Sequence, residues 1–494
     1  MSRQEKCDVI VVGGGSAALE SAVSARQNGA EKIIMVEKAP EAEFGGNARF
    51  SHTGFRFAYN GPADIRGLVP DVDNAEFDRF HIPPYTPDIF MADLNRVTRG
   101  RINQELARFM VDQSASALRW MHETGIVFEP ELNIELDGKY YFEPGIIVHT
   151  KGGGLGQLLR WREIALGMGI ELRYETKVTG LLGNCRRVEG VALSAPDEDY
   201  ELVAPSTIVC SGGFQASAEM RGRYLGVNAD LMRVRGSKHD TGEVLNMLVA
   251  MGAKTSGHWQ GAHATPIDRD VPDGGVPLRE DGHATGANRY DYMYGITVNG
   301  LAQRFYDEGE ANLSYTYAKT GAAVLAQPGS TAHQIFDQKG VDLFLHGAEY
   351  TDNYEVAPTI AELATKIGLQ PEVLAHTVEA YNAACRTDIP FDASKLDGKC
   401  TTGLSPNKSN WAEPIVKGPF RAYPITCGVT FSFGGVQIDT KAQVLDSGDN
   451  PIKGLYASGD VVGLFFHNYP SCTGQTRNAV FSRQAGQSAA ALSN

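Results

Sequence analysis

The chain opens with a short apolar, β-branched run at residues 7–12, Cys-Asp-Val-Ile-Val-Val, which is bounded by glycines. Such a run is typical of a strand that is buried in a parallel sheet. The Ala-rich stretch from Ser16 to Asn28 predicts a helix that ends at Gly29. Residues 32–37 predict a second apolar strand. The opening is therefore expected to be a βαβ unit.

Helical and extended patterns alternate along most of the remaining chain. Helical spacing predicts helices at residues 102–123, 155–168, 359–367, 371–386 and 474–492. Apolar runs predict strands at 171–182, 189–193, 207–210, 434–438 and 454–457. Between about 260 and 300, Gly, Asp, Arg and Tyr dominate and the periodicity fades. We interpret this irregular middle as part of an insertion between two parts of one nucleotide-binding domain.

The composition narrows the class of protein. The 494 residues exceed the length of one ordinary domain, and a net charge of −14 argues against sequence-independent binding of nucleic acid. A few arginines in one pocket are still compatible with an anionic substrate. The 55 glycines are the unusual count, and they follow no repeat. The sequence must therefore be searched for motifs in which glycine has a structural role.

The cysteines and the chain ends contribute expectations about location and metals. The N-terminal residues show no secretory signal pattern, and no apolar run is long enough to span a bilayer. The seven cysteines are scattered and show no spacing that is typical of zinc, iron–sulfur or haem sites. We therefore expect reduced thiols, a cytoplasmic location and no metal.

A dinucleotide fingerprint follows the first strand. Gly13-Gly14-Gly15-Ser16-Ala17-Ala18 is a G-x-G-x-x-A motif in which Gly13 allows a tight turn and Gly15 lets a pyrophosphate approach the backbone. Ala18 lets the helix pack against the strand, and the helix N-terminus offers free N–H groups to phosphates. Glu37 lies at the end of the second strand, where an acid accepts hydrogen bonds from a ribose. The turn predicts dinucleotide binding.

Further motifs carry a resemblance that covers nearly the whole chain. They occur in this order: Gly45-Gly46-Asn47, Thr241-Gly242-Glu243, Gly434-Gly435-Val436, Gly459-Asp460 and Ser482-Arg483-Gln484-Ala485-Gly486. The chain resembles the fumarate reductase/succinate dehydrogenase flavoprotein family. Within it, the tricarballylate dehydrogenase branch is suggested by Arg304-Phe305-Tyr306-Asp307-Glu308-Gly309, Tyr315-Thr316-Tyr317-Ala318-Lys319, Gly428-Val429-Thr430-Phe431-Ser432-Phe433-Gly434 and Asn468-Tyr469-Pro470.

The resemblance implies an α/β fold and an FAD cofactor. A Rossmann-like FAD-binding domain would be built from residues 1–262 and 429–494, with an inserted α+β capping domain at 263–428. Asn47 stands where members with a histidyl–flavin bond have the histidine, so non-covalent FAD is expected; His52, nearby, could still lie close to the flavin. The expected FAD-binding residues are Gly13, Gly15, Ser16, Ala17, Ala18, Glu37, Lys38, Gly45, Gly46, Asn47, Val178, Gly212, Gly459, Asp460, Gly474 and Thr476.

The substrate residues of the family are mostly replaced. Fumarate reductases hold a dicarboxylate between arginines and histidines and protonate it with an arginine. The resemblance puts Asn312 and Leu313 at the proton-donating arginine, Thr430-Phe431 at the histidine pair and Tyr469-Pro470 at a clamping arginine. Of the family's set only a histidine remains, at His263. We therefore expect that the chain does not reduce fumarate.

Aromatic residues take the place of these cations. As in the 3-ketosteroid dehydrogenases of the same superfamily, tyrosines could polarise a carbonyl and move a proton while FAD exchanges a hydride. We expect α,β-dehydrogenation, or the reverse ene-reduction, of a small carbonyl or carboxylate compound. The candidate catalytic residues are Tyr292, Tyr294, Tyr469 and His263. Each of them could instead be a core residue, because aromatic side chains dominate apolar burial.

Three alternatives stay open. Arg56, Arg289 and Arg421 could rebuild a carboxylate clamp for a tricarballylate-like polycarboxylate. A precorrin-modifying flavoprotein of the same branch would need an iron–sulfur partner. A flavin-binding protein without redox turnover is the alternative of another class. Because only one dinucleotide fingerprint is present, the electrons are expected to pass to oxygen, a quinone or a partner protein, and the sequence leaves this choice open.

Overall fold

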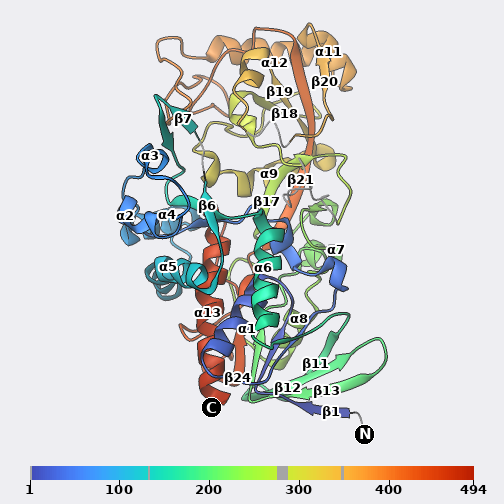
Figure 1. Cartoon of the computed structure of the whole chain (residues 1–494). Helices are drawn as coiled ribbons and strands as arrows, with labels where there is room; N and C mark the ends of the chain where they lie inside the picture. The colour runs from blue at the N-terminus through green and yellow to red at the C-terminus, as the bar shows by residue number, and fades with distance from the viewer. Residues whose placement is uncertain (1–2, 132–133, 275–286, 346–349, 494) are drawn as a thin grey trace.

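The computed structural model describes residues 3–131, 134–274, 287–345 and 350–493. Two lobes, each built on its own sheet, lie one above the other, and the N- and C-terminal elements meet at the far end of the lower lobe (Figure 1). Helices and strands are mixed in both lobes, so the predicted α/β class is confirmed.

The larger sheet has ten strands, and both ends of the chain contribute to it. Its central strands run in the order β24-β14-β2-β3-β10 and are all parallel; Thr207 pairs with both Ile10 and Leu455. The predicted buried parallel strand is therefore confirmed. The ten strands are β1 (Arg3–Lys6), β2 (Val9–Val12), β3 (Ile33–Val36), β10 (Glu171–Arg173), β11 (Lys177–Asn184), β12 (Arg187–Ser194), β13 (Asp199–Val203), β14 (Ser206–Val209), β23 (Gln443–Leu445) and β24 (Pro451–Ala457).

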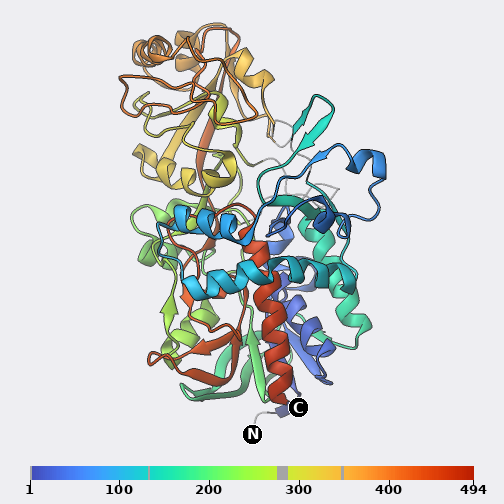
Figure 2. The same cartoon turned by 90° about the vertical axis from the view of Figure 1, so that its left-hand side faces the viewer.

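Three helices pack on this sheet: α1 (Ser16–Gln27), α8 (Glu243–Met251) and α13 (Thr473–Ser493). Outside them, α6 (Gly153–Gly167) packs on α1, α5 (Gln104–Thr124) on α13, and α4 (Pro87–Thr98) on α5. The helices predicted at 16–28, 102–123, 155–168 and 474–492 are confirmed within a few residues. Helix α13 runs along α1 through the middle of the lower lobe (Figure 2). A Cβ atom on Gly486 would lie 2.5 Å from the backbone oxygen of Ser21, so the two helices touch through their backbones.

The second sheet has six strands and forms the upper lobe. They are β15 (Arg233–Val234), β17 (Ala262–Asp268), β18 (Ile296–Asn299), β19 (Thr331–Phe336), β20 (Glu355–Ala357) and β21 (Phe420–Ser432). The long strand β21 pairs with β15, β17, β19 and β20, and it extends from the upper lobe toward the lower one (Figure 1). It thus crosses position 428, where the sequence suggested a domain boundary.

The expectation that the chain is irregular between 260 and 300 was wrong for β17 and β18. Both strands are buried, yet they carry polar residues that hide the apolar pattern. Buried Asp268 on β17, for example, lies 2.8 Å from the guanidinium of Arg289, which is also buried. A charge that is neutralised inside a sheet leaves no hydrophobic signal in the sequence.

Smaller elements complete the two lobes. The upper lobe holds α9 (Tyr317–Leu325), α10 (Gln338–Asp342), α11 (Ile360–Lys366) and α12 (Pro371–Ala384), and the predicted helices at 359–367 and 371–386 are confirmed. A three-stranded sheet in the lower lobe has the order β4 (Gly54–Arg56), β9 (Ile146–Thr150), β6 (Phe128–Pro130). The strand predicted at 434–438 is only β22 (Gly435–Val436), which pairs with β16 (Thr255–Ser256).

The remaining short elements are α2 (Pro62–Arg66), α3 (Asn74–Phe77), α7 (Ala218–Met220), β5 (Phe80–His81), β7 (Ile134–Leu136) and β8 (Lys139–Tyr141). In the part of the chain that the structure describes, no helix combines the length and the apolarity that crossing a membrane requires.

Gly486→Val tests the contact between α1 and α13. The added side chain meets the backbone of α1, so we expect the free energy of unfolding to fall by about 1–3 kcal/mol. Urea unfolding followed by circular dichroism measures this change. Gly222→Val is the matched control, because nothing lies within 4 Å of a Cβ at Gly222. Equal stability of the two variants would contradict the proposed contact.

Candidate active site

A cavity of about 850 Å³ lies between the two lobes, and we call it the central cavity. Its lower wall is formed by residues that follow β2, β3, β14 and β24. These are the carboxyl ends of parallel strands, where ligands bind in open α/β sheets. Its upper wall comes from β17, β21 and neighbouring segments of the upper lobe.

The glycine turn after β2 shapes one end of the central cavity. Gly13 has a φ of 118°, and a Cβ there would lie 2.4 Å from the backbone oxygen of Cys210, so only glycine fits. Gly15 is the N-cap of α1, and no side chain caps this helix end. The first N–H groups of α1 are thus left for a ligand, which is the arrangement that binds a pyrophosphate.

Glu37 follows β3 and faces the same turn. Its Oε1 accepts a hydrogen bond of 2.7 Å from the backbone N–H of Ala39, and the carboxylate also accepts one from the backbone N–H of Gly14. Burial raises the pKa of Glu37, although these hydrogen bonds oppose the shift. The carboxyl group is therefore fixed beside the glycine turn and lines the same cavity, where it would be able to bind the hydroxyl groups of a dinucleotide.

Most of the residues predicted to bind FAD line this one cavity. They are Gly13, Gly15, Ser16, Ala17, Glu37, Lys38, Gly45, Gly46, Asn47, Val178, Gly212, Gly459, Asp460 and Gly474. Ala18 and Thr476 are fully buried and do not line it. The hydroxyl of Thr476 instead donates a hydrogen bond of 2.6 Å to the backbone oxygen of Arg56.

Asp240 also lines the cavity, although it was not among the predicted site residues. It is buried, and its Oδ2 accepts a hydrogen bond of 2.8 Å from Gln215. Burial, together with the nearby carboxylates of Asp460 and Glu37, raises its pKa well above the usual range. Asp240 directly precedes the motif Thr241-Gly242-Glu243, and this position could have identified it as a site residue.

Asn47 joins the lower wall to the upper one. Its side-chain nitrogen donates to the backbone oxygen of Thr430 on β21, and its side-chain oxygen accepts a hydrogen bond of 2.9 Å from the backbone N–H of Ser237. Both ends of the amide are therefore occupied by protein backbone.

A β-bulge sets the upper wall. On β21, Thr430 and Phe431 together oppose the single residue His263 on β17, because the register shifts between Ala262 and Ala264. A bulge of this kind turns side chains toward a new direction and is common beside active sites. All three of these residues line the central cavity.

Aromatic residues surround His263. Its ring centre lies 4.8 Å from that of Tyr317, 5.3 Å from that of Tyr469 and 5.5 Å from that of Phe431. Neither ring nitrogen of His263 has a hydrogen-bond partner among the described residues. Burial, with a smaller contribution from Arg235, lowers its pKa well below the usual range, so His263 is neutral near pH 7.

Tyr469 and Tyr317 form a hydroxyl pair on the cavity wall. Their oxygens lie 2.7 Å apart, and Ser471 donates a hydrogen bond of 3.3 Å to the hydroxyl of Tyr317. Burial raises the pKa of Tyr469 well above its usual range, and the neighbouring Tyr317 adds to the shift. Both phenols are therefore protonated at neutral pH. Tyr317 was not among the predicted catalytic residues.

The other two candidate tyrosines lie differently. Tyr294 lines the central cavity, and burial raises its pKa to about 12. Tyr292 does not line the cavity, and its hydroxyl forms a hydrogen bond of 2.6 Å with Oγ1 of Thr316. The structure therefore brings Tyr294, Tyr469 and His263 to the cavity and places Tyr292 behind its wall.

The three arginines considered for a carboxylate clamp do not line the central cavity: Arg56, Arg289 and Arg421. Arg56, for example, donates a hydrogen bond of 2.9 Å to the backbone oxygen of Ser471. Arg235 and Arg477 line the cavity instead. Arg477 pairs with Asp460, whereas Arg235 binds the neutral side chains of Asn288 and Thr430, at 2.8 and 3.0 Å. No sequence motif pointed to Arg235.

Comparisons with known proteins agree with this arrangement. Residues 8–475 match the family described as FAD binding domain. The chain is 27% identical to the NADH:fumarate oxidoreductase of Klebsiella pneumoniae, with 92% of this chain and 44% of that protein covered. It is also 27% identical to the probable fumarate reductase Ifc3 of Shewanella frigidimarina, with 98% and 75% covered.

A solved structure shows the same fold. The 3-ketosteroid Δ1-dehydrogenase of Sterolibacterium denitrificans matches with a TM-score of 0.75 at 20% identity, and the match covers 98% of this chain and 99% of that one. The chain spans less than half the length of the Klebsiella protein and about three quarters of the Shewanella protein. From its motifs, its cavity and the family match over residues 8–475, the chain belongs to the FAD binding domain family and is an FAD-dependent oxidoreductase.

Proposed function

We propose that this protein catalyses ene-reduction, or the reverse α,β-dehydrogenation, of a small carbonyl or monocarboxylate compound. The observation that supports this most directly is the hydroxyl pair of Tyr469 and Tyr317 on the wall of the central cavity. When bound, FAD would donate a hydride from N5 in its reduced form during ene-reduction, or accept one in its oxidised form during dehydrogenation. We propose that the residues of the central cavity that were predicted to bind FAD hold it without a covalent bond, because Asn47 stands where members with a histidyl–flavin bond have the histidine.

The tyrosine pair provides a proton. Because Ser471 donates to the hydroxyl of Tyr317, Tyr317 can donate its own proton to the oxygen of Tyr469. The hydroxyl of Tyr469 is then free to point into the cavity as a donor. Its raised pKa keeps it protonated at neutral pH, and a protonated phenol acts as an acid rather than a base. We therefore assign Tyr469 the role of proton donor in the direction of reduction.

The charges of the cavity favour a substrate with at most one carboxylate. His263 is neutral, and Arg477 is already paired with Asp460. Arg235 makes no ion pair with a described carboxylate, so it can bind one carbonyl or carboxylate oxygen of the substrate. Asn312 and Leu313 also line the cavity, which supports the view that the arginine of the fumarate reductases is replaced here.

A tricarballylate-like substrate is the second candidate. It is favoured by the resemblance around Arg304 and Asn468. Arg304, however, pairs with Glu308 and does not line the cavity, and neither do the three arginines of the alternative clamp. A substrate with three carboxylates would meet few unpaired cations in the cavity.

We propose that FAD exchanges electrons with oxygen, a quinone or a partner protein. A nicotinamide nucleotide bound to this chain is less favoured, because the sequence has one dinucleotide fingerprint. The seven cysteines form no disulfide, which supports the proposed cytoplasmic location.

Tyr469→Phe tests the proton donor. Because a positioned acid contributes roughly 10²–10⁴-fold, we expect turnover to fall at least about 100-fold while the FAD content stays unchanged. Tyr317→Phe, which interrupts the pair, is expected to cause a smaller loss. Tyr306→Phe is the matched control, because the hydroxyl of Tyr306 binds Thr297 and does not face the cavity. Full activity of Tyr469→Phe would refute the assignment.

The substrate class is tested by mixing dithionite-reduced protein anaerobically with candidate acceptors. Cyclohex-2-enone or crotonate should reoxidise the flavin faster than fumarate, because among the described residues of the cavity wall Arg235 is the arginine without an ion pair, and no dicarboxylate clamp is formed by them. Stopped-flow absorbance at the flavin band measures the rates. Faster reoxidation by fumarate would contradict the proposal, and no reoxidation by any of these compounds would favour a flavin-binding protein without turnover.

Gly13→Ala tests the cofactor turn. The methyl group would meet the backbone oxygen of Cys210, so we expect the affinity for FAD to fall at least about 10-fold, with Gly222→Ala as control.

Unfolding the wild-type protein in acid tests whether FAD is bound covalently, and it should release all of the flavin as free FAD, measured by chromatography. Flavin that stays with the precipitated chain would show a covalent bond.

A further inference from the structure

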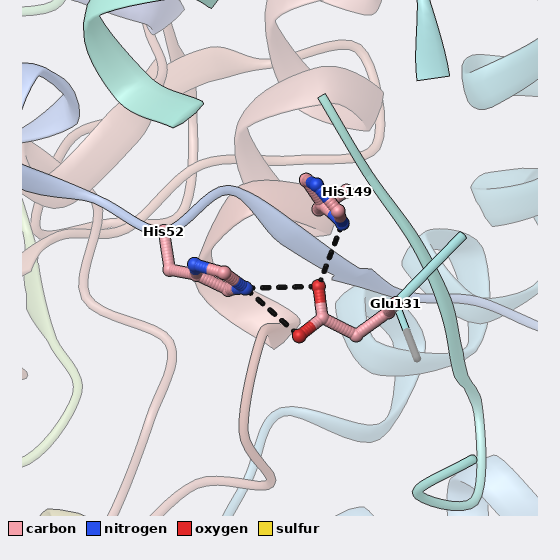
Figure 3. Close-up of side chains that lie close together, drawn as sticks. All are labelled: His52, Glu131 and His149. Atoms are coloured by element: carbon pink, nitrogen blue, oxygen red, sulfur yellow. Dashed lines mark hydrogen bonds and ion pairs between the residues drawn. The ribbon is translucent and has the colours of Figure 1, made fainter. Parts of the chain in front are cut away.

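Two histidines and a glutamate meet at the wall of the central cavity. His52 lies just before β4, Glu131 just after β6, and His149 on β9 between these two strands. Figure 3 shows both imidazole rings directed at the carboxylate of Glu131. His149 pairs with Gly54 on one side and with Glu129 on the other, so the sheet itself brings the three residues together.

The distances within this cluster are short. Nε2 of His52 lies 2.8 and 2.9 Å from the two oxygens of Glu131, and Nδ1 of His149 lies 3.0 Å from one of them. One ligand atom from each of the three residues lies within 4.8 Å of the others. Nδ1 of His149 is buried, and although it is close to Glu131 it makes no hydrogen bond. The centres of the two imidazole rings lie 5.3 Å apart.

These separations suit a tetrahedral metal ion. Zinc bonds to imidazole nitrogen and carboxylate oxygen are about 2.0–2.1 Å long, so two ligands of a tetrahedral ion lie about 3.3 Å apart. The nitrogen–oxygen distances in the cluster are only slightly shorter.

We propose that His52, Glu131 and His149 bind a divalent transition metal ion of the zinc class. His52 and Glu131 line the central cavity, so the fourth position of the ion opens into it. Two histidines, one glutamate and an open position form the ligand set of a zinc ion that can also bind a small molecule. Nε2 of His149 lies 3.9 Å from Glu129, so a second carboxylate faces the other nitrogen of this ring without a hydrogen bond to it.

This site goes beyond the proposed function, since neither the hydride transfer nor the tyrosine pair requires a metal. It would add a positive charge to a cavity in which Arg477 is already neutralised by Asp460. The sequence expectation of no metal was based on cysteine and histidine spacing. The three ligands are far apart along the chain and meet only in the folded sheet.

Isothermal titration of the chelator-treated, FAD-loaded protein with Zn²⁺ tests the proposal. We expect one Zn²⁺ per chain in the wild type, and at least about a 100-fold loss of affinity in Glu131→Gln and His149→Ala. His376→Ala is the control, because His376 is an exposed histidine on α12, away from the cluster. FAD content and circular dichroism show whether each variant folds.

His52→Ala keeps the test decisive if the more buried variants do not fold, because the side chain of His52 is 55% exposed. Titration with Co²⁺ gives a second measurement: the strong visible absorption of four-coordinate cobalt is expected in the wild type and not in His52→Ala. Absence of stoichiometric Zn²⁺ binding, or equal binding in the wild type and the cluster variants, would overturn the proposal. Neither result depends on the substrate, so the proposed function is tested separately.

Discussion

The close contact between α1 and α13 is the constraint on which the rest of this structure depends. Gly486 has no side chain, so the C-terminal helix can lie against the backbone of the first helix at Ser21. This contact brings the end of the chain beside its beginning. As a result Gly459 comes so near Ala17 that a Cβ on the glycine would lie 3.0 Å from the alanine side chain. Segments from both chain ends thus form one cofactor cradle.

The sequence predicted the parts of the fold that have a clear apolar or Ala-rich pattern. The opening βαβ unit and the final helix are of this kind, because most of their buried residues are apolar or small. The prediction failed for β17, where buried polar residues are neutralised by distant partners such as Arg289. Such pairs are fixed by the tertiary fold, and no local pattern reveals them.

The same distinction applies to the site. The glycine turns were predictable because a close backbone approach permits only one residue type. The tyrosines were not separable by sequence, because Tyr292 and Tyr469 differ only in where their hydroxyls point. Arg235 reaches the cavity from a segment in which no motif marks it, and the motif that contains Tyr317 assigned it no role in catalysis. The sequence therefore predicted the backbone of the site, but it could not predict which side chains point into the cavity.

Strand β21 has a structural consequence. It starts at Phe420, within the apolar core of the upper lobe, and continues without interruption to Phe431 and Ser432. At its far end the backbone N–H of Phe214, in the lower lobe, donates to the hydroxyl of Ser432. The strand thus joins the two apolar cores: Phe420 packs in the core of the upper lobe, whereas Phe431 packs with Tyr469 in the larger core. One uninterrupted backbone therefore carries residues of both cores, and the cavity wall at Thr430 and Phe431 is a direct continuation of the upper sheet.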